Sequence, residues 1–321
     1  MRDACESRPS KSKASATCGP FSFELPAGAA GSVIIAPMRF VKFHGYGNDY
    51  IVCARAELPD EPALPAFVRR VCERHYGAGA DGIATLERAD ATTADFILRI
   101  FNADGSEAAM SGNGSRSAAA FLYYEGQWTQ DTLRLQTRAG VKLYQLIERD
   151  ERGRYKFAAE MGAPRFASGS IPMLTDEPLP RVINYPLDVG DGEVLHVTAL
   201  EMCNPNTCVF VADFAAVDWR RLGRSIESHA RFPQRTNVEF IRVLDRAQIE
   251  VRIWERGVGE TLSSGTGACA AAVAACAHEL TARRVSVHTP GGRLEVDWRA
   301  DGEVVLTGEA EVIYRGEWLQ A

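Results

Sequence analysis

A short pattern of residues occurs twice in the chain, and in each copy a serine precedes a glycine pair and a run of alanines. The first copy reads Glu-Ala-Ala-Met-Ser-Gly-Asn-Gly from Glu107, and the second reads Glu-Thr-Leu-Ser-Ser-Gly-Thr-Gly from Glu260. The serines before the glycines are Ser111 and Ser264. Glycine lets backbone approach a ligand closely, and a helix start leaves N–H groups without partners. Each copy therefore predicts a turn that attracts a carboxylate or phosphate and stabilises a nearby anionic group. Two such turns facing each other would hold one small anion between two candidate bases.

Taken singly, a Ser-Gly-x-Gly segment before a helix is usually an ordinary N-cap. The duplication is what favours a functional site. Neither copy completes a Walker A loop or a GxGxxG fingerprint, so nucleotide binding is not indicated. The chain also lacks a GxSxG elbow, so the serines do not indicate a hydrolase.

From Arg39 onward, most of the chain is predicted to form strands that position these turns. Apolar and polar residues alternate with period two between short turns such as Arg-Ala-Gly and Pro-Gly-Gly, which is typical of antiparallel meanders. Helices are predicted at 62–76 and 215–229, and two alanine-rich helices are predicted near Gly114 and Gly267. Few helices among many hairpins indicate an α+β fold.

Composition excludes several classes of protein. The 321 residues are 46% hydrophobic and 24% charged, which describes a soluble globular chain with room for two domains. A net charge of −6 without a dense Lys/Arg run disfavours nucleic-acid binding, and no apolar run is long enough to span a membrane. The eight cysteines form no CxxC pair and mostly lie among apolar residues. Free thiols in a reducing compartment explain this pattern better than disulfides or a metal site, so we expect a cytoplasmic protein without a metal.

The domain organisation is predicted from changes of pattern along the chain. Residues 1–37 are polar, rich in serine and without periodicity, which indicates a disordered extension or a start codon placed too early, with Met38 as the first residue. An N-terminal domain is expected over 38–159 and a C-terminal domain over 160–309. The last strand, 310–321, is a candidate to return to the N-terminal domain.

Ordered blocks of the sequence resemble the signature blocks of the diaminopimelate epimerase family. They run from about Arg39 to the C-terminus and read FVKFHGYGNDYIV, RHYGAGADGI, RIFNADGSEAAMSGNG, CNP, TNVEF and ERGVGETLSSGTGACA. The resemblance implies two pseudo-symmetric domains, each a curled antiparallel β-sheet around a central helix, with the site in the cleft between them. It also implies a two-base reaction without a cofactor, in which one group removes the α-proton of diaminopimelate and the opposite group returns a proton to the other face. That reaction interconverts the LL and meso forms for lysine and peptidoglycan precursors.

The resemblance implies a role for each matching residue. Ser111 and Ser264 fall on the two positions of the catalytic bases. The residues implied to hold the substrate, an amino-acid dicarboxylate, are Asn48, Asn102, Gly112, Asn113, Asn204, Asn237, Glu255, Arg256, Gly265 and Thr266. Any single asparagine in this set could instead be a turn or cap residue, and Glu255 with Arg256 could be a plain ion pair.

The chain departs from the family pattern where the chemistry is done. Both family cysteines are serine here, and the usual Asn-Pro-His is Asn204-Pro205-Asn206. A thiol titrates near pKa 8.5 and can be lowered at a helix N-terminus, whereas an alkoxide lies far higher. Serine is therefore a poor base unless a partner takes its proton. His44 and His75 lie in signature blocks, but the sequence does not place either beside a serine, and Cys269 is expected to point away from the site.

Three functions are consistent with this pattern. The first is diaminopimelate epimerisation. The second is another isomerase or dehydratase reaction of the same fold, on a different amino or hydroxy acid. The third is a binding protein that kept the anion-holding turns and lost the bases. A small-molecule substrate is expected in the first two cases, and a homodimer is left open.

Overall fold

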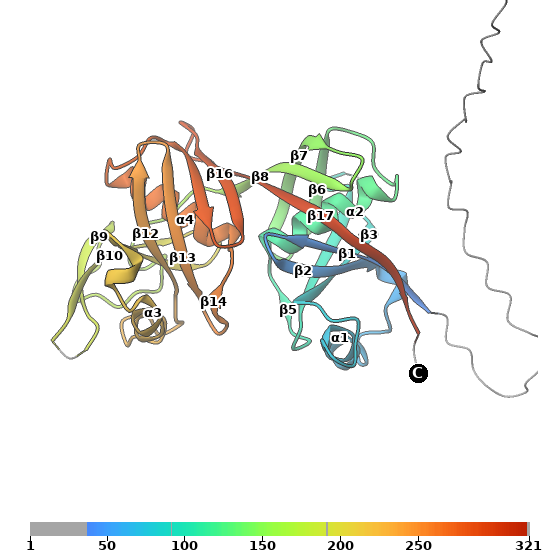
Figure 1. The fold of residues 1–321 in the computed structure, drawn as a ribbon, viewed down its shortest axis with the longest axis horizontal. Coiled ribbons are helices and arrows are strands. Elements are labelled where there is room, and N and C mark those ends of the chain that lie inside the picture. Colours follow the sequence, from blue (N-terminus) through green and yellow to red (C-terminus); the bar gives the residue numbers. More distant parts are fainter. Residues whose placement is uncertain (1–36, 91, 191, 320–321) are drawn as a thin grey trace, which may run out of the picture. The chain divides into compact units, whose positions relative to one another are not determined.

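The computed structural model describes residues 37–90, 92–190 and 192–319. The extension predicted over 1–37 lies outside the described residues, except for residue 37. The boundaries proposed for the two domains stay a prediction. For description, strands β1–β8 are called the N-terminal half and strands β9–β16 the C-terminal half (Figure 1).

Strands dominate both halves, as the alternating pattern predicts. Those of the N-terminal half are β1 (Met38–Gly45), β2 (Asn48–Ala54), β3 (Gly82–Arg88), β4 (Phe96–Asn102), β5 (Glu107–Ala108), β6 (Thr132–Thr137), β7 (Gly140–Arg149) and β8 (Arg154–Gly162). Those of the C-terminal half are β9 (Val182–Asp188), β10 (Val194–Glu201), β11 (Pro205–Phe210), β12 (Asn237–Asp245), β13 (Gln248–Glu255), β14 (Gly259–Thr261), β15 (Arg284–Thr289) and β16 (Gly292–Trp298). The last strand is β17 (Val304–Trp318).

The two halves repeat one order of strand pairing. In the N-terminal half, β1–β2 is antiparallel, β2–β3 parallel, β3–β4 and β4–β5 antiparallel, β4–β6 parallel and β6–β7 antiparallel. In the C-terminal half, β10 to β16 follow the same order of antiparallel and parallel pairs. The repetition seen in the sequence around the two serines therefore extends to the whole scaffold of each half.

Each half is built around one buried helix (Figure 1). Helix α2 (Gly112–Tyr124) is buried along most of its length in a core with residues of β1–β4 and β6–β8. Helix α4 (Gly265–Ala277) is almost entirely Ala, Cys and Val after its glycines, and it is buried in the core of the C-terminal half. A helix that is apolar on every side is stable only when it is enclosed, which is why the sheet curls around it. The predicted α+β fold, with a curled sheet around a central helix in each half, is confirmed.

Two shorter helices cover outer faces of the sheet. The helix predicted at 62–76 is observed as α1 (Leu64–Cys72), and the one predicted at 215–229 is observed as α3 (Trp219–Glu227). Both bury one face only, which agrees with their mixed composition. The remaining short elements are the 3₁₀ helices η1 (Arg55–Glu57) and η2 (Phe214–Ala216).

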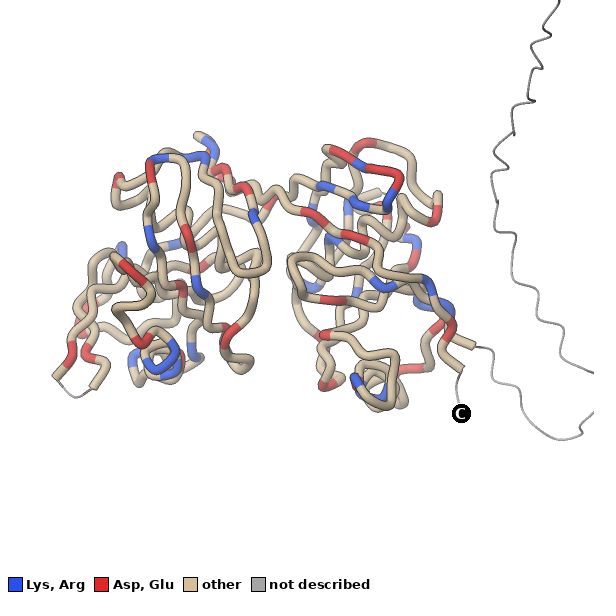
Figure 2. The backbone as a smooth tube through the Cα atoms, viewed as in Figure 1, with Lys and Arg blue, Asp and Glu red and all other residues tan. Residues whose placement is uncertain are grey.

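Strand β17 connects the two halves. Residues 304–307 pair with β16 on one side and with β8 on the other, the pairing with β8 continues to Glu311, and from Glu311 to Trp318 the strand pairs with β1. Lys and Arg are interspersed with Asp and Glu along both halves (Figure 2). In the part of the chain that the structure describes, no helix is long and apolar enough to cross a membrane.

Candidate active site

Both serines cap a buried helix, and the two caps have nearly the same backbone geometry. Ser111 precedes α2 with φ −136° and ψ 125°, and Ser264 precedes α4 with φ −134° and ψ 131°. The Ser111 hydroxyl accepts a hydrogen bond from Gly114 N at 3.1 Å, and the Ser264 hydroxyl accepts one from Gly267 N at 3.4 Å. We call Ser111–Gly114 the first serine turn and Ser264–Gly267 the second. The two turns are structural copies of one another.

The two serine turns meet at their first glycines. A Cβ added at Gly112 would lie 3.6 Å from the Cα of Gly265, and a Cβ added at Gly265 would lie 3.6 Å from the Cα of Gly112. The N–H groups of a first helical turn lack intrahelical partners, and a helix N-terminus carries a partial positive charge. The two helix N-termini therefore lie together, and the binding of an anion between them stays a prediction.

Ser111 has a hydrogen-bonding partner that the sequence analysis did not single out. The hydroxyl of Tyr50, on β2, donates to Ser111 Oγ at 2.9 Å. The Tyr50 ring is buried against two glycines: a Cβ at Gly82 would lie 2.8 Å from Tyr50 Cε1, and one at Gly114 would lie 3.0 Å from it. Burial raises the pKa of Tyr50 to about 12, so the phenol remains protonated at neutral pH and can donate to the serine.

Ser264 lies beside a carboxyl group instead. Burial raises the pKa of Glu255, while hydrogen bonds from Thr261 and Ser264 lower it in part. Thr261 Oγ1 donates to Glu255 Oε1 at 3.1 Å, and Ser264 Oγ lies 3.4 Å from Thr266 Oγ1. A carboxylate whose pKa is raised towards the working pH is a better general base, and it can take a proton through a hydroxyl that touches it.

A second carboxyl group, Glu239 on β12, is fully buried behind the second serine turn. Its Oε1 would lie 2.9 Å from a Cβ at Gly267, and it has no hydrogen-bond partner among the described residues. Its other oxygen accepts from Cys208 Sγ at 3.8 Å. Burial, with a smaller contribution from Glu255, raises the pKa of Glu239 well above its ordinary range, which favours the protonated form.

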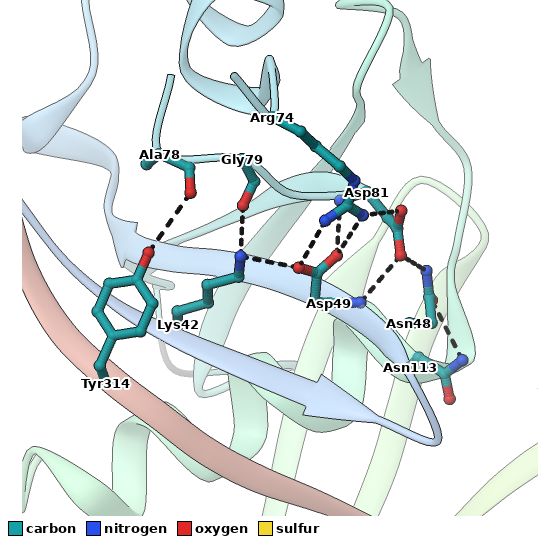
Figure 3. Close-up of polar contacts among 9 residues, drawn as sticks. All are labelled: Lys42, Asn48, Asp49, Arg74, Ala78, Gly79, Asp81, Asn113 and Tyr314. Atoms are coloured by element: carbon teal, nitrogen blue, oxygen red, sulfur yellow. Dashed lines mark hydrogen bonds and ion pairs between the residues drawn. The ribbon is translucent and has the colours of Figure 1, made fainter. Parts of the chain in front are cut away.

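Asn48 and Asn113, both implied by the resemblance to hold substrate, are hydrogen-bonded to each other (Figure 3). Asn113 Nδ2 donates to Asn48 Oδ1 at 3.1 Å, and Asn48 Nδ2 donates to Asp81 Oδ2 at 2.8 Å. Asn113 Oδ1 accepts from Arg116 Nη2. Each amide therefore has a donor and an acceptor on opposite sides, which sets the orientation of both side chains.

A cluster of two acids and two bases anchors that amide pair (Figure 3). Arg74 Nη2 donates to Asp49 Oδ1 at 2.8 Å and to Asp81 Oδ1 at 2.6 Å, and Lys42 Nζ lies 2.8 Å from Asp49 Oδ2. Burial acts to raise the pKa of Asp49, but hydrogen bonds from Arg74 and Lys42 outweigh it and hold the pKa well below its ordinary value. The cluster is balanced in formal charge.

The asparagines of the C-terminal half also form a chain of hydrogen bonds. Asn237 Nδ2 donates to Asn206 Oδ1 at 3.3 Å, and Asn206 Nδ2 donates to Asn204 Oδ1 at 3.0 Å. The backbone N–H of Arg256 donates to Asn237 Oδ1 at 2.9 Å. The guanidinium of Arg256 donates to the backbone carbonyl of Gln234, before β12, at 2.9 Å.

Some candidate residues are not brought to the serines. Asn102 is exposed at the end of β4, where its Nδ2 donates to Ser106 Oγ at 3.0 Å. His44 Nε2 lies 3.9 Å from Glu311, and among the described residues no histidine hydrogen-bonds to either serine. Cys269 is fully buried, and burial raises its pKa, so its thiol is not available as a base. Tyr50 and Glu239 lie within the signature blocks, but the sequence does not predict their roles, because no local pattern shows which side chain reaches a serine turn.

Solved structures share this fold at low sequence identity. A phenazine biosynthesis protein of the PhzF family from Bacillus anthracis has a TM-score of 0.65 at 16% identity, covering 89% of this chain and 100% of that one. A hydroxyproline epimerase from Agrobacterium vitis has a TM-score of 0.64 at 16% identity, covering 88% and 92%. The chain, with its paired serine turns, therefore has the fold that these proteins share.

Sequence comparison narrows the class to one family. The model of the diaminopimelate epimerase family matches residues 40–167 and 198–313. A diaminopimelate epimerase of Pelotomaculum thermopropionicum is 43% identical over 284 residues, covering 88% of this chain and 99% of that protein. Diaminopimelate epimerase 1 of a Nostoc species is 41% identical over 283 residues, covering 87% and 99%. The chain belongs to the diaminopimelate epimerase family, as the resemblance of its signature blocks predicted.

Proposed function

We propose that this protein is a diaminopimelate epimerase that interconverts the LL and meso forms by proton transfer at one α-carbon. The observation that carries the proposal is the contact between the two serine turns at Gly112 and Gly265. A substrate carboxylate between the two helix N-termini would receive N–H groups from both turns. Its α-carbon would then have one serine on each face.

On one face, Ser264 and Glu255 act together. The Glu255 carboxylate accepts the hydroxyl proton of Ser264, and Ser264 Oγ takes the α-proton of the substrate. The hydroxyl of Ser264 acts to lower the pKa of Glu255, which supports this pairing of the serine with the carboxylate. The carbanion left on the α-carbon is stabilised through its carboxylate by the N–H groups of both turns.

On the opposite face, Ser111 and Tyr50 return a proton. The Ser111 hydroxyl donates its proton to the α-carbon, and the Tyr50 phenol replaces that proton across the 2.9 Å hydrogen bond. Tyr50 then regains a proton, and Glu255 loses one, through solvent. Running the same steps backwards converts the other stereoisomer.

Exchange of the α-proton with solvent tests this proposal. In D₂O, the unmodified protein should incorporate deuterium at the α-carbon of LL-diaminopimelate, measured by NMR, while Ser111→Ala and Ser264→Ala should each lose about 100-fold or more of the rate. Ser117→Ala is a matched control, because Ser117 is a buried serine on α2 outside the serine turn. Absence of exchange in the unmodified protein, with or without binding of diaminopimelate, would contradict the proposal.

The same experiment separates an enzyme from a binding protein. A protein that has lost its bases would bind diaminopimelate without exchanging the proton, and it would gain exchange when Ser111→Cys and Ser264→Cys are combined. The hydroxyl partners Tyr50 and Glu255 favour the enzyme over this alternative.

Cellular location and assembly remain part of the proposal. The described cysteines are all free, which supports a cytoplasmic, reducing location. A homodimer is a further prediction, and sedimentation equilibrium of the purified protein would measure it.

A further inference from the structure

Arg116 is the largest side chain that the fold buries completely, and it lies where the two serine turns meet. It is on α2, one turn beyond Ser111, with a relative exposure of 1%. Its Nη1 would lie 3.6 Å from a Cβ at Gly112 and 3.9 Å from a Cβ at Gly265. Its Cζ would lie 3.1 Å from a Cβ at Gly308, on β17. The absence of a side chain at Gly308 therefore leaves room for the guanidinium, which lies within van der Waals reach of both serine turns.

This arginine has no acidic partner among the described residues. Its Nη2 donates to the neutral amide of Asn113, its Nε has no hydrogen-bond partner in the described structure, and its Cζ lies 5.8 Å from the centre of the Tyr46 ring. Burial lowers the pKa of Arg116, and the groups that counteract this effect are Tyr46, Tyr144 and Cys269, none of them a carboxylate. A guanidinium does not lose its proton in proteins, so the charge is present.

Such a placement is costly unless an anion compensates it. A buried charge without a counter-charge is unfavourable, and the partial positive charges of two helix N-termini add repulsion to it. Asp49 and Asp81 are paired with Arg74 and Lys42, and Asp81 reaches Arg116 only through the amides of Asn48 and Asn113. The carboxyl groups at the second serine turn, Glu255 and Glu239, are not among the groups that act on the pKa of Arg116. The counter-charge missing from the protein is therefore a single negative charge at the junction of the two turns.

We propose that Arg116 supplies the fixed positive charge that holds the substrate's α-carboxylate between the serine turns and stabilises the negative charge that this carboxylate gains when the α-proton leaves. The inference rests on the proposed function, because it takes the α-carboxylate as the anion. Arg116 would then strengthen substrate binding and also raise the rate of proton removal. A fixed charge in a site that excludes water stabilises the developing negative charge without any rearrangement of solvent or side chains.

If Arg116 lacks a counter-charge in the free protein, removing its charge should not destabilise that protein. Arg116→Met keeps most of the side-chain volume and removes the charge, so the free protein should unfold at the same or a higher urea concentration. A structural role, in which Arg116 links α2 to β17, requires the opposite. Arg134→Met is the control, because Arg134 forms an ion pair with Asp95. Removing the Arg134 charge should lower the stability of the protein or leave it unchanged, and it should not alter substrate binding.

The test combines urea unfolding, calorimetric binding of meso-diaminopimelate and α-proton exchange in D₂O. We expect Arg116→Met to weaken binding at least tenfold and to lower the exchange rate at saturation by a further factor of ten or more. Arg116→Lys, which keeps the charge, should bind within a few-fold of the unmodified protein. Failure of Arg116→Met to fold, a lower unfolding midpoint with unchanged affinity, or equal losses for Lys and Met would each overturn the proposal.

These three measurements also distinguish a failure of this inference from a failure of the proposed function. If the unmodified protein neither binds nor exchanges diaminopimelate, the proposed function fails. The urea comparison needs no substrate, so it still decides whether the charge of Arg116 destabilises the free protein. If the unmodified protein binds and exchanges while Arg116→Met does so equally well, the inference alone fails.

Discussion

The hydrogen bond from Tyr50 to Ser111 predicts that Tyr50→Phe will slow catalysis in this serine enzyme and have little effect in a cysteine version of it. The phenol stabilises negative charge on Ser111 Oγ, which forms as the serine gives its proton to the α-carbon. The hydrogen bond is 2.9 Å long, and the Tyr50 side chain is buried. A hydrogen bond to a group that becomes charged contributes about 1.5–3 kcal/mol. Since each 1.36 kcal/mol is tenfold in rate, kcat should fall about 10- to 150-fold.

The comparison requires four proteins: the unmodified chain, Tyr50→Phe, Ser111→Cys and the double variant. A thiol ionises far more readily than a hydroxyl, especially at a helix N-terminus, so it needs no phenol. In the Ser111→Cys background, Tyr50→Phe should change kcat by no more than about threefold, which is within the range of an ordinary neutral hydrogen bond. KM should change little in either background, because the phenol acts through the serine.

Tyr123→Phe is the matched control. Tyr123 is a buried tyrosine of α2 whose hydroxyl donates to the carbonyl of Gln130 at 2.6 Å, away from the serine turn. It should leave kcat unchanged while lowering stability by about 1 kcal/mol. Equal losses of kcat for Tyr50→Phe in the serine and cysteine backgrounds would refute the reasoning, because they would show that Tyr50 only supports the packing of the site.

Further predictions concern the buried carboxyl groups. The native pKa of Glu239 is raised above the unfolded value of 4.5, so the native state holds a proton that the unfolded chain releases. The free energy of unfolding therefore falls as pH rises from 4.5 to the native pKa. In urea unfolding between pH 5 and 8, Glu239→Gln should remove this pH dependence, which amounts to up to about 1.4 kcal/mol per pH unit. Asp49 is the opposite case: its depressed native pKa contributes stability above its ordinary pKa that is lost as pH falls towards the native value. Asp49→Asn, which leaves Lys42 and Arg74 without their shared partner, should lower stability by about 3 kcal/mol at pH 7, with a smaller difference below pH 4. Gly267→Ala would place a Cβ 2.9 Å from Glu239 Oε1, and thermal unfolding should show a loss of about 1–3 kcal/mol together with slower α-proton exchange.

The serine turns could be predicted from the sequence because their physics is local. A serine, two glycines and a run of alanines specify an N-cap and a buried helix within a few residues, and both copies have the predicted form. The partners of the serines could not be predicted, because they depend on packing between distant segments. Tyr50 and Ser111 are 61 positions apart, and they meet only because glycines at Gly82 and Gly114 make room for the ring. The burial of Arg116 could not be predicted either, because an arginine on a helix is ordinarily solvated.

The repeated topology shows how one scaffold provides different chemistry on two faces. Tyr50 pairs with the first residue of β3, and Asn206 occupies the same register position beside the first residue of β12. Likewise, Glu255 follows Trp254, which pairs with Glu260 of β14. Asn102 holds the same position in the first half, because it follows Phe101, which pairs with Glu107 of β5. Each half thus carries one amide and one titratable group at these two positions, but in exchanged places.

The titratable group is a phenol in the first half and a carboxyl group in the second. At neutral pH a phenol with a raised pKa is a proton donor, whereas a carboxylate is an acceptor. This difference favours removal of the α-proton on the side of Glu255 and return of a proton on the side of Tyr50.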